Sequence, residues 1–422
     1  MKIAKITVRN FKSFHHQEIC FHNFSILIGG NASGKSNIIS LFKFISNLMK
    51  FGLDEAISRI GGIDSFVNAA IGSKETTRLR YEIDFHDNEI ITKKKEDSLT
   101  YLQVEQVNFE LEIKSNENSL DYSVINDELT IKYLCYDKQA RQRGFFTVII
   151  SKNNEIDSQV NFQAFPGKTS EEIENSIKED ERFLQEYVTY FLRILHSSND
   201  VTIKSLQFMI PEFIDCNSFV KIYDFNPKEL KKPSLLTSFK SLDERGLNLA
   251  NLLYTITKRP KEEEKLLDIL ADTLPFIKKI DFEIGSDKSV SYVVQESYSN
   301  RLLNASNLSD GTVVMLTIIV ALYFDEKTGV IALEEPERSL HPRLLRKLLE
   351  MVKEVSTERQ VIITTHNPEL LKHSPLEAII FAKRQQDGFT TIIYPESSEN
   401  VKVFLDNELG IDDLFIQDLL GD

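Results

Sequence analysis

The residues best suited to chemistry begin with the segment Gly29-Gly-Asn-Ala-Ser-Gly-Lys-Ser36, which matches G-x-x-x-x-G-K-[ST] at every fixed position. Glycine lacks the Cβ that would block a phosphate and permits positive φ, so successive backbone N–H groups can point at one anion. Lys35 can place its ammonium against the β- and γ-phosphates of a nucleotide, and Ser36 can offer a hydroxyl oxygen to Mg²⁺. The motif predicts a phosphate-binding loop.

The residues on either side of this loop predict a strand before it and a helix after it. Phe24–Ile28 is an apolar run that ends at two glycines, as a buried strand does where it meets a turn. After the loop, apolar residues recur at steps of three and four: Ile38, Ile39, Phe42, Ile45, Leu48 and Met49. A helix there would direct its positive end at the anion. A glycine turn with an exposed lysine is the alternative, and the strand–loop–helix order favours nucleotide binding.

Two adjacent carboxylates follow a second apolar run, Val330-Ile-Ala-Leu-Glu-Glu335. Because open α/β sheets bind ligands at the carboxyl ends of their strands, Glu334 can face a metal ion held near the loop. Glu335 can then accept a proton from attacking water. A solvated strand end is the alternative, and the glycine-rich loop in the same chain favours a nucleotide site.

Two further segments place polar residues at predicted element ends. Leu308-Ser-Asp-Gly-Thr312 precedes an apolar helix, so Ser309 or Asp310 can serve as its N-cap, or the helix N-terminus can meet an anion. Val361-Ile-Ile-Thr-Thr-His366 is a buried strand that ends in an imidazole. His366 is either a structural histidine or a contact to the γ-phosphate.

Length and composition exclude several classes of protein. The chain has 422 residues, a formal net charge of −14 and three scattered cysteines, so a disulfide framework or a structural zinc site is not expected. The acidic balance disfavours a protein coated with DNA along its length, although a local basic groove remains compatible with it. The longest apolar run is shorter than a bilayer requires, and the N-terminus lacks a signal peptide. We therefore expect a soluble, cytoplasmic protein without a membrane partner.

The remaining segments predict an α/β fold. Residues 78–86, 100–114, 128–136 and 144–151 alternate apolar and polar positions as strands do, and 171–195 carries one helical stripe. Towards the C-terminus, helices at 261–279, 313–324 and 342–356 alternate with buried strands at 330–333 and 361–364, which predicts a largely parallel sheet. A hairpin is expected from 377–382 and 389–394.

Taken together and in this order, the motifs resemble the ABC-type ATPases of the RecF/SMC branch, including predicted ATPases of bacterial antiviral systems. The resemblance covers roughly 1–60 and 240–375 and rests on IxVRNFKSF at the N-terminus, GGNASGKSN, GLNLA at 246–250, LSDGT, IALEEPERSLHP and TTHNPELL. It implies an ABC-type P-loop NTPase head, a mixed and parallel sheet flanked by helices, with an α+β insertion between Walker A and the signature motif.

The resemblance also implies a role for individual residues. Walker A would bind ATP through Gly29, Gly30, Asn31, Ala32, Ser33, Gly34, Lys35, Ser36 and Asn37. Ser36 and Glu334 would hold Mg²⁺, and Glu335, His366 and Lys35 would be the catalytic residues. The signature motif would contact ATP bound to a partner protomer through Leu308, Ser309, Asp310, Gly311 and Thr312. The Q-loop glutamine stays open among Gln103, Gln106, Gln163 and Gln207.

From these motifs we predict four regions. The N-terminal part of the head spans 1–85, the insertion 86–240, the C-terminal part of the head 241–395 and an acidic tail 396–422. Some relatives carry a Toprim nuclease after the head, and the residues that follow His366 are too few to hold one. We therefore expect a chain without a Toprim domain.

The predicted function is an ATPase that forms a dimer or a higher even-numbered oligomer around ATP. It would regulate a separately encoded effector, such as a nuclease, as the sensor or scaffold subunit of an antiviral complex. One alternative is a RecF-like ATPase that acts directly on DNA, for which the cluster Arg338, Arg343, Arg346 and Lys347 is a candidate contact. Another is a scaffold that binds ATP without turnover.

Overall fold

The computed structural model describes residues 1–85, 90–95, 98–116, 121–136, 142–152, 156–164, 182, 185, 201–206, 219–239, 241–325, 328–399, 401 and 410–417. The chain divides into two compact units. Unit 1 comprises Met1–Phe21, Ser36–Phe219 and Arg384–Ile392, and unit 2 comprises His22–Lys35, Val220–Lys383 and Ile393–Asp422. The four predicted regions with boundaries at 85, 240 and 395 stay a prediction.

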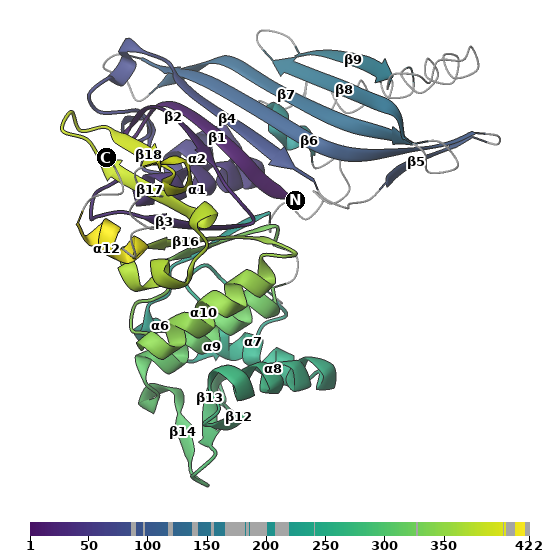
Figure 1. Cartoon of the computed structure of the whole chain (residues 1–422). Coiled ribbons are helices and arrows are strands. Elements are labelled where there is room, and N and C mark those ends of the chain that lie inside the picture. The colour runs from purple at the N-terminus through teal and green to yellow at the C-terminus, as the bar shows by residue number, and fades with distance from the viewer. Residues whose placement is uncertain are drawn as a thin grey trace. The chain divides into compact units, whose positions relative to one another are not determined.

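Unit 1 contains an antiparallel sheet with the strand order β2-β1-β4-β6-β7-β8-β9, and β5 pairs with β6. Figure 1 shows the long strands β6, β7 and β8 running side by side. The strands are β1 (Lys2–Phe11), β2 (Phe14–Cys20), β4 (Thr77–Asp84), β5 (Ile90–Lys95), β6 (Ser98–Ser115), β7 (Tyr122–Tyr136), β8 (Gln142–Lys152) and β9 (Ile156–Ala164). Alternate residues are buried, as in β4 and β7, so the predicted strands in this part of the chain are confirmed.

The helices of unit 1 begin with α1 (Lys35–Phe51), whose residues from Ser36 onward belong to this unit. Its apolar face is buried: the Tyr81 hydroxyl of β4 donates to the Leu41 carbonyl at 2.9 Å, and the rings of Phe21 and Phe42 meet edge-on. The shorter helices are α2 (Leu53–Arg59), α3 (Ile63–Phe66), η1 (Gly72–Lys74) and η2 (Thr202–Ser205). Apart from residues 182 and 185, the predicted helix at 171–195 lies outside the described residues.

Unit 2 is built on a parallel sheet with the strand order β10-β15-β16-β3-β17. The strands are β3 (Phe24–Ile28), β10 (Val220–Tyr223), β15 (Val330–Glu334), β16 (Gln360–Thr365) and β17 (Ile379–Arg384), with β18 (Thr390–Ile393) next in the chain. The parallel sheet predicted for this part of the chain is therefore confirmed. Because the strands are parallel, β3, β10, β15 and β16 end at one edge, which we call the carboxyl edge.

Two long helices accompany this sheet, α9 (Asp310–Tyr323) and α10 (Pro342–Val355), and lie side by side in Figure 1. Residues 311–322 of α9 are all buried, whereas α10 buries one face. Both agree with the predicted helices. No helix in the described part of the chain is long and apolar enough to cross a membrane.

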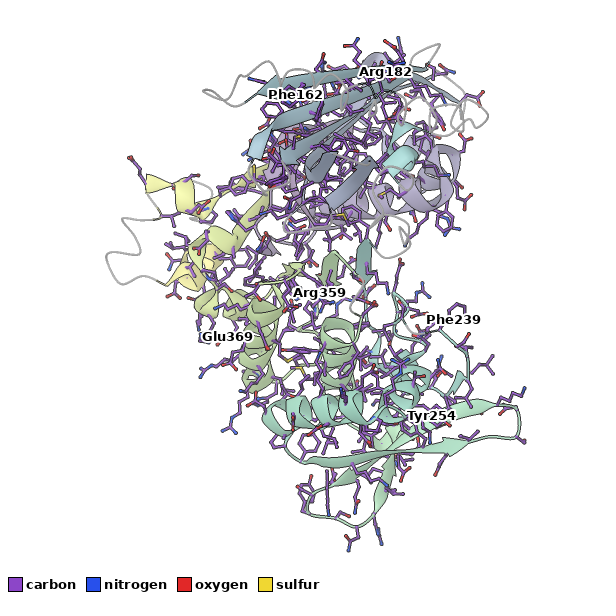
Figure 2. The ribbon with its side chains drawn as sticks, turned by 90° about the vertical axis from the view of Figure 1, so that its right-hand side faces the viewer. Phe162, Arg182, Phe239, Tyr254, Arg359 and Glu369 are labelled. Atoms are coloured by element: carbon purple, nitrogen blue, oxygen red, sulfur yellow. The ribbon has the colours of Figure 1, made fainter. Side chains whose placement is uncertain are left out.

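A smaller antiparallel sheet in unit 2 consists of β11 (Ser234–Leu235), β12 (Ile277–Ile284), β13 (Ser289–Glu296) and β14 (Leu302–Asn304). It packs against α7 (Leu249–Thr257) and α8 (Pro260–Thr273), where Tyr254, labelled in Figure 2, meets Phe282 edge-on. The helix predicted at 261–279 was too long. Its end at Thr273 has a physical reason, because Pro275 disfavours helical backbone at Leu274.

The remaining short elements of unit 2 are α6 (Pro227–Leu230), η4 (Ala305–Asn307), η5 (Pro368–His373), η6 (Leu376–Ala378), η7 (Pro395–Ser397) and α12 (Ile411–Ile416). The acidic α12 is docked within the unit: Asp412 forms an ion pair with Lys372 at 3.2 Å, and Phe415 packs edge-on against Phe381. The fold class is α/β, as predicted.

Candidate functional site

The glycine-rich loop follows β3, whose five residues are all buried. A Cβ at Gly29 would lie 2.3 Å from the carbonyl oxygen of Ala382 and 2.5 Å from Ser33 Oγ, so no other residue fits there. Ala32 and Gly34 have φ of 61° and 111°, which bends the backbone into the left-handed region. The backbone therefore has the turn that an anion-binding loop requires.

Lys35 turns its side chain back into this loop. Its Nζ donates to the carbonyl oxygens of Gly29 at 2.6 Å and Gly30 at 2.9 Å, and the residue is only 7% exposed. Burial lowers the pKa of Lys35, and the carboxylates of Glu335 and Glu337 act in the opposite direction. The loop thus encloses an ammonium group next to two acids of the same unit.

The other predicted loop residues lie in more than one environment. Asn31, Ala32 and Ser36 are exposed, and Ser33 is buried. Asn37 belongs to unit 1, where its Nδ2 donates to Ser13 Oγ at 2.7 Å. This side chain therefore holds the turn between β1 and β2.

Glu335 lies just beyond β15 and has a φ of 44°, an unusual value for a residue with a side chain. Its backbone N–H donates to the carbonyl oxygen of Thr364 at 2.9 Å and to Thr364 Oγ1 at 3.2 Å. These bonds attach the start of the loop that follows β15 to the neighbouring strand β16. Backbone strain of this kind persists where the surroundings enforce it, often at functional sites.

The carboxylate of Glu335 contacts a guanidinium group and an imidazole. Its Oε2 accepts from Arg338 Nε at 2.8 Å and lies 3.5 Å from His366 Nδ1. Burial would raise the pKa of Glu335, but Arg338 and His366 outweigh it and hold the pKa below its ordinary value. Glu335 is therefore ionised at neutral pH and within reach of His366.

Two acidic residues at the carboxyl edge, Asp224 and Glu337, were not among the site residues predicted from the sequence. Glu337 is 7% exposed, bonds to Thr365 Oγ1, and has a pKa that burial raises. Asp224 directly follows β10 and lies 3.5 Å from Arg338 through Oδ1 and Nη1. The alternation Glu335-Pro-Glu337 and the apolar run before Asp224 were the signals available. Neither reveals burial or which strands are neighbours.

The segment Leu308–Thr312 forms the N-terminus of α9. Ser309 is its N-cap, accepting the Thr312 N–H at 3.1 Å, and Asp310 pairs with Lys231 at 2.6 Å. A Cβ at Gly311 would lie 2.6 Å from the carbonyl oxygen of Ser339, so glycine is required. The N-cap interpretation is correct for Ser309, and the loop after β15 touches this helix N-terminus.

The structure brings only some of the predicted site residues together. Within the described residues, no hydrogen bond joins residues 308–312 to Lys35, Glu335 or His366. No group of three or more His, Cys, Asp or Glu side chains suited to a metal ion occurs there either. A hydroxyl, a carboxylate and phosphate oxygens would suffice for Mg²⁺, which prefers few protein ligands. The assignment of Ser36, in unit 1, and of Glu334, in unit 2, to these roles stays a prediction.

None of the three glutamine candidates that the structure describes belongs to unit 2. Gln103 and Gln106 lie in β6 and Gln163 lies in β9, all in unit 1, and Gln207 lies outside the described residues. Gln103 accepts a hydrogen bond from the Tyr136 hydroxyl, and Gln106 donates to Asp84. Among the described residues, β10 pairs with β15, and the residue that directly follows β10 is Asp224.

The basic cluster considered for DNA contact is partly neutralised. Arg338 pairs with Glu335 and Asp224, and Lys347 pairs with Asp272 at 2.9 Å and Glu350 at 3.1 Å. Its other two members, Arg343 and Arg346, are exposed on α10.

Comparisons with known proteins show the family to which the chain belongs. Over residues 24–372 the chain matches the family described as AAA domain, putative AbiEii toxin, Type IV TA system. It is also similar to the endonuclease GajA of Bacillus cereus (strain VD045), with 23% identity over 385 residues, 88% of this chain and 56% of that protein. The chain thus spans about half the length of this curated relative.

Solved structures similar to this chain include two SMC heads. An SMC head bound to the C-winged helix domain of ScpA aligns with a TM-score of 0.49 and 12% identity, covering 93% of this chain and 98% of that chain. The SMC head domain from Thermotoga maritima aligns with a TM-score of 0.44 and 12% identity, covering 93% and 99%.

Proposed function

Because the chain belongs to the AAA family described as putative AbiEii toxin, Type IV TA system, and its motifs resemble those of ABC-type ATPases of the RecF/SMC branch, we propose that it hydrolyses ATP to ADP and phosphate. One observation carries this proposal. In unit 2 the ammonium of Lys35 lies inside a loop in which position 29 accommodates only glycine. At the ends of the neighbouring strands β15 and β16, Glu335 Oε2 and His366 Nδ1 lie 3.5 Å apart.

Each of these residues has a task in hydrolysis. The backbone N–H groups of 29–34 and the ammonium of Lys35 bind phosphate oxygens. Glu335, ionised at neutral pH, accepts a hydrogen bond from the attacking water and orients it. His366 can donate to the transferred phosphoryl group from beside Glu335. Mg²⁺, held by Ser36 and Glu334, would neutralise charge on the phosphates.

The test is single-turnover ATP hydrolysis by the wild type and by Glu335→Gln. Removal of a general base costs about 10²- to 10⁴-fold in rate. Glu264→Gln, at an exposed position of α8, is the matched control and should hydrolyse ATP at the wild-type rate. Equal rates for Glu335→Gln and the wild type would remove Glu335 as the base.

We also propose that the chain forms a dimer or higher even-numbered oligomer in which 308–312 of one protomer closes the ATP site of another. The N–H groups at the start of α9 and the hydroxyls of Ser309 and Thr312, 2.7 Å apart, suit an anion. Ser309→Arg alone should be inactive, and mixing it with Lys35→Ala should restore part of the activity. Full activity of Ser309→Arg alone would contradict completion in trans.

For the biological role we propose regulation of a separately encoded effector, such as a nuclease, in antiviral defence. The match to a family described as putative AbiEii toxin, Type IV TA system, and the similarity to an endonuclease support this proposal, and this chain spans 56% of that endonuclease. Direct action on DNA is the second candidate, supported by the exposed Arg343 and Arg346 on α10. ATP-dependent, salt-sensitive DNA binding would favour it, whereas co-purification of a toxic neighbour protein favours the regulator. A scaffold without turnover is the third, and the ionised Glu335 disfavours it.

A further inference from the structure

Glu337 lies two residues beyond Glu335 and is almost completely buried, with 7% of its surface exposed. Its Oε1 accepts a hydrogen bond from the hydroxyl of Thr365. Thr365 is the last residue of β16, is fully buried, and directly precedes His366. Glu337 therefore connects the loop that carries Glu335 to the strand end that carries His366.

Thr365 extends this connection into the next loop. While its hydroxyl donates to Glu337, its Oγ1 accepts the backbone N–H of Asn367 at 2.9 Å. The carboxylate, the hydroxyl and the amide form a short chain of hydrogen bonds that anchors the residues on either side of His366, whose side chain is 52% exposed. A backbone held on both sides leaves a side chain few alternative positions.

The loop after β15 is attached to β16 at a second point as well. The backbone N–H of Glu335 donates to Thr364, to its carbonyl oxygen at 2.9 Å and to its Oγ1 at 3.2 Å. Both attachments lie next to the residues whose side chains approach each other, with Glu335 Oε2 3.5 Å from His366 Nδ1. Of the two, only the bond from Glu337 to Thr365 is made entirely by side chains, so it can be removed without changing the backbone.

Stability alone gives no reason for an acid at this position. Glu337 Oε2 is buried and has no hydrogen-bond partner among the described residues, which is unfavourable for a carboxylate. Burial raises the pKa of Glu337, and the bond from Thr365 only partly offsets it. The carboxylate does act on the site, because together with Glu335 it favours the charged form of the buried Lys35.

We propose that Glu337 is a positioning residue: through Thr365 it holds His366 at the distance from Glu335 at which both act on the same phosphate and water. This inference rests on the proposed ATPase function. Misplacing a catalytic group by 1 Å can cost about 100-fold in rate, so one bond of this kind has a measurable effect on turnover.

The test compares substitutions that keep or remove the bond. Glu337→Leu fills the same buried space without an acceptor, and we expect kcat to fall about 10- to 100-fold with KM for ATP changed by less than about twofold. Glu337→Gln keeps an acceptor oxygen and should stay within roughly threefold of the wild-type kcat. Thr365→Val should reproduce Glu337→Leu, and Thr365→Ser should resemble the wild type.

A double variant and a matched control complete the experiment. Glu337→Leu with Thr365→Val should be no slower than either single variant, because both remove one interaction. Asp127→Asn is the control. Asp127 is also a buried carboxylate that accepts a hydrogen bond from a threonine hydroxyl, that of Thr202 in unit 1. The Asp127→Asn variant should have the wild-type kcat. Wild-type kcat in Glu337→Leu, equal losses in Glu337→Gln and Glu337→Leu, or additive losses in the double variant would overturn the proposal.

A crystallographic comparison separates this proposal from the proposed ATPase function. In crystals without nucleotide, Glu337→Leu should shift the distance between Glu335 Oε2 and His366 Nδ1 away from the 3.5 Å of the wild type. An unchanged distance would overturn the positioning role, whatever the turnover. Absence of wild-type turnover would instead overturn the ATPase function, and the crystallographic comparison would still decide whether Glu337 positions the pair.

Discussion

One face of the unit 1 sheet, which carries Lys5, Arg9 and Glu82 and which we call the unit 1 face, is rich in charged residues, as is the carboxyl edge of the unit 2 sheet. The charged side chains have different surroundings in the two regions. On the unit 1 face, cations and anions pair with each other, as Lys5 does with Glu82 and Arg9 with Glu75, each at 2.9 Å. The side chains of these pairs are 20–49% exposed. In water such pairs are screened and contribute little to stability.

At the carboxyl edge two of the charged side chains are withdrawn from solvent. Lys35 and Glu337 are each 7% exposed, and Glu335 has a φ of 44°. Buried charge and strained backbone both cost free energy, and they persist where the arrangement serves a function. The comparison therefore favours unit 2 as the location of the proposed chemistry.

The sharpest test of this contrast exchanges one lysine in each region. Lys35→Ala removes the ammonium from the loop and should weaken ATP binding at least about 100-fold, because it removes a buried, charge-assisted contact to phosphate. Lys5→Ala, at a partly exposed ion pair of unit 1, is the control and should keep the wild-type Kd. Isothermal titration calorimetry measures both, and equal Kd values for Lys35→Ala and the wild type would refute the loop assignment.

Buried charge in unit 1 should affect stability and leave catalysis unchanged. Burial raises the pKa of Asp127 from its ordinary 3.8 to about 6. Between pH 3.8 and 6 the Asp127 carboxyl is deprotonated in the unfolded chain and protonated in the folded protein. The stability that this group provides is therefore complete below pH 3.8 and is lost as pH rises through 6. At about 1.4 kcal/mol per pH unit the loss is about 3 kcal/mol. Urea unfolding at pH 4 and pH 7.5 measures it.

Asp127→Asn provides the reference for that experiment. The amide does not titrate and its oxygen can still accept from Thr202, so this contribution to the pH dependence should disappear. A wild-type and a variant curve that change equally between the two pH values would show that Asp127 does not titrate in this range.

The phosphate-binding loop should tolerate a methyl group at one glycine and not at another. Gly29→Ala places a Cβ 2.3 Å from the Ala382 carbonyl oxygen and should lower the free energy of unfolding by about 1–3 kcal/mol. At Gly30 nothing lies within 4 Å, so Gly30→Ala should unfold like the wild type. Thermal unfolding without nucleotide distinguishes the two, and equal Tm values would contradict the close approach.

The smallest effect on the free energy of unfolding is expected on the unit 1 face. Arg9→Ala removes the ion pair with Glu75, whose side chains are 49% and 35% exposed, and should cost less than about 1 kcal/mol. The difference should shrink further in 0.5 M salt. A larger, salt-independent loss would mean that this face carries more than screened pairs.

The sequence was most informative where function depends on neighbours in the chain. The glycines, Lys35 and Ser36 form one continuous motif, and Glu335 and His366 each end an apolar strand, so local pattern was enough to name them. The parallel sheet followed from alternating apolar strands and helices.

What escaped prediction depends on contacts between distant segments. Asp224 reaches the carboxyl edge because β10 pairs with β15, and Glu337 accepts its hydrogen bond from Thr365, 28 residues further along the chain. The strands β12 to β14 were not predicted, and part of β12 was assigned to a helix because Ile277 and Ile280 continue the apolar spacing of α8. Pairing with β13 decides their conformation, and no local pattern records that pairing.

The most direct test of the central claim is a structure of this chain with Mg²⁺ and a non-hydrolysable ATP analogue. The account predicts phosphate oxygens within hydrogen-bonding distance of Lys35 Nζ and of the backbone N–H groups of residues 29–34, with Glu335 and His366 facing the terminal phosphate. A nucleotide bound away from residues 29–36, with Lys35 still bonded to the carbonyl oxygens of Gly29 and Gly30, would contradict it.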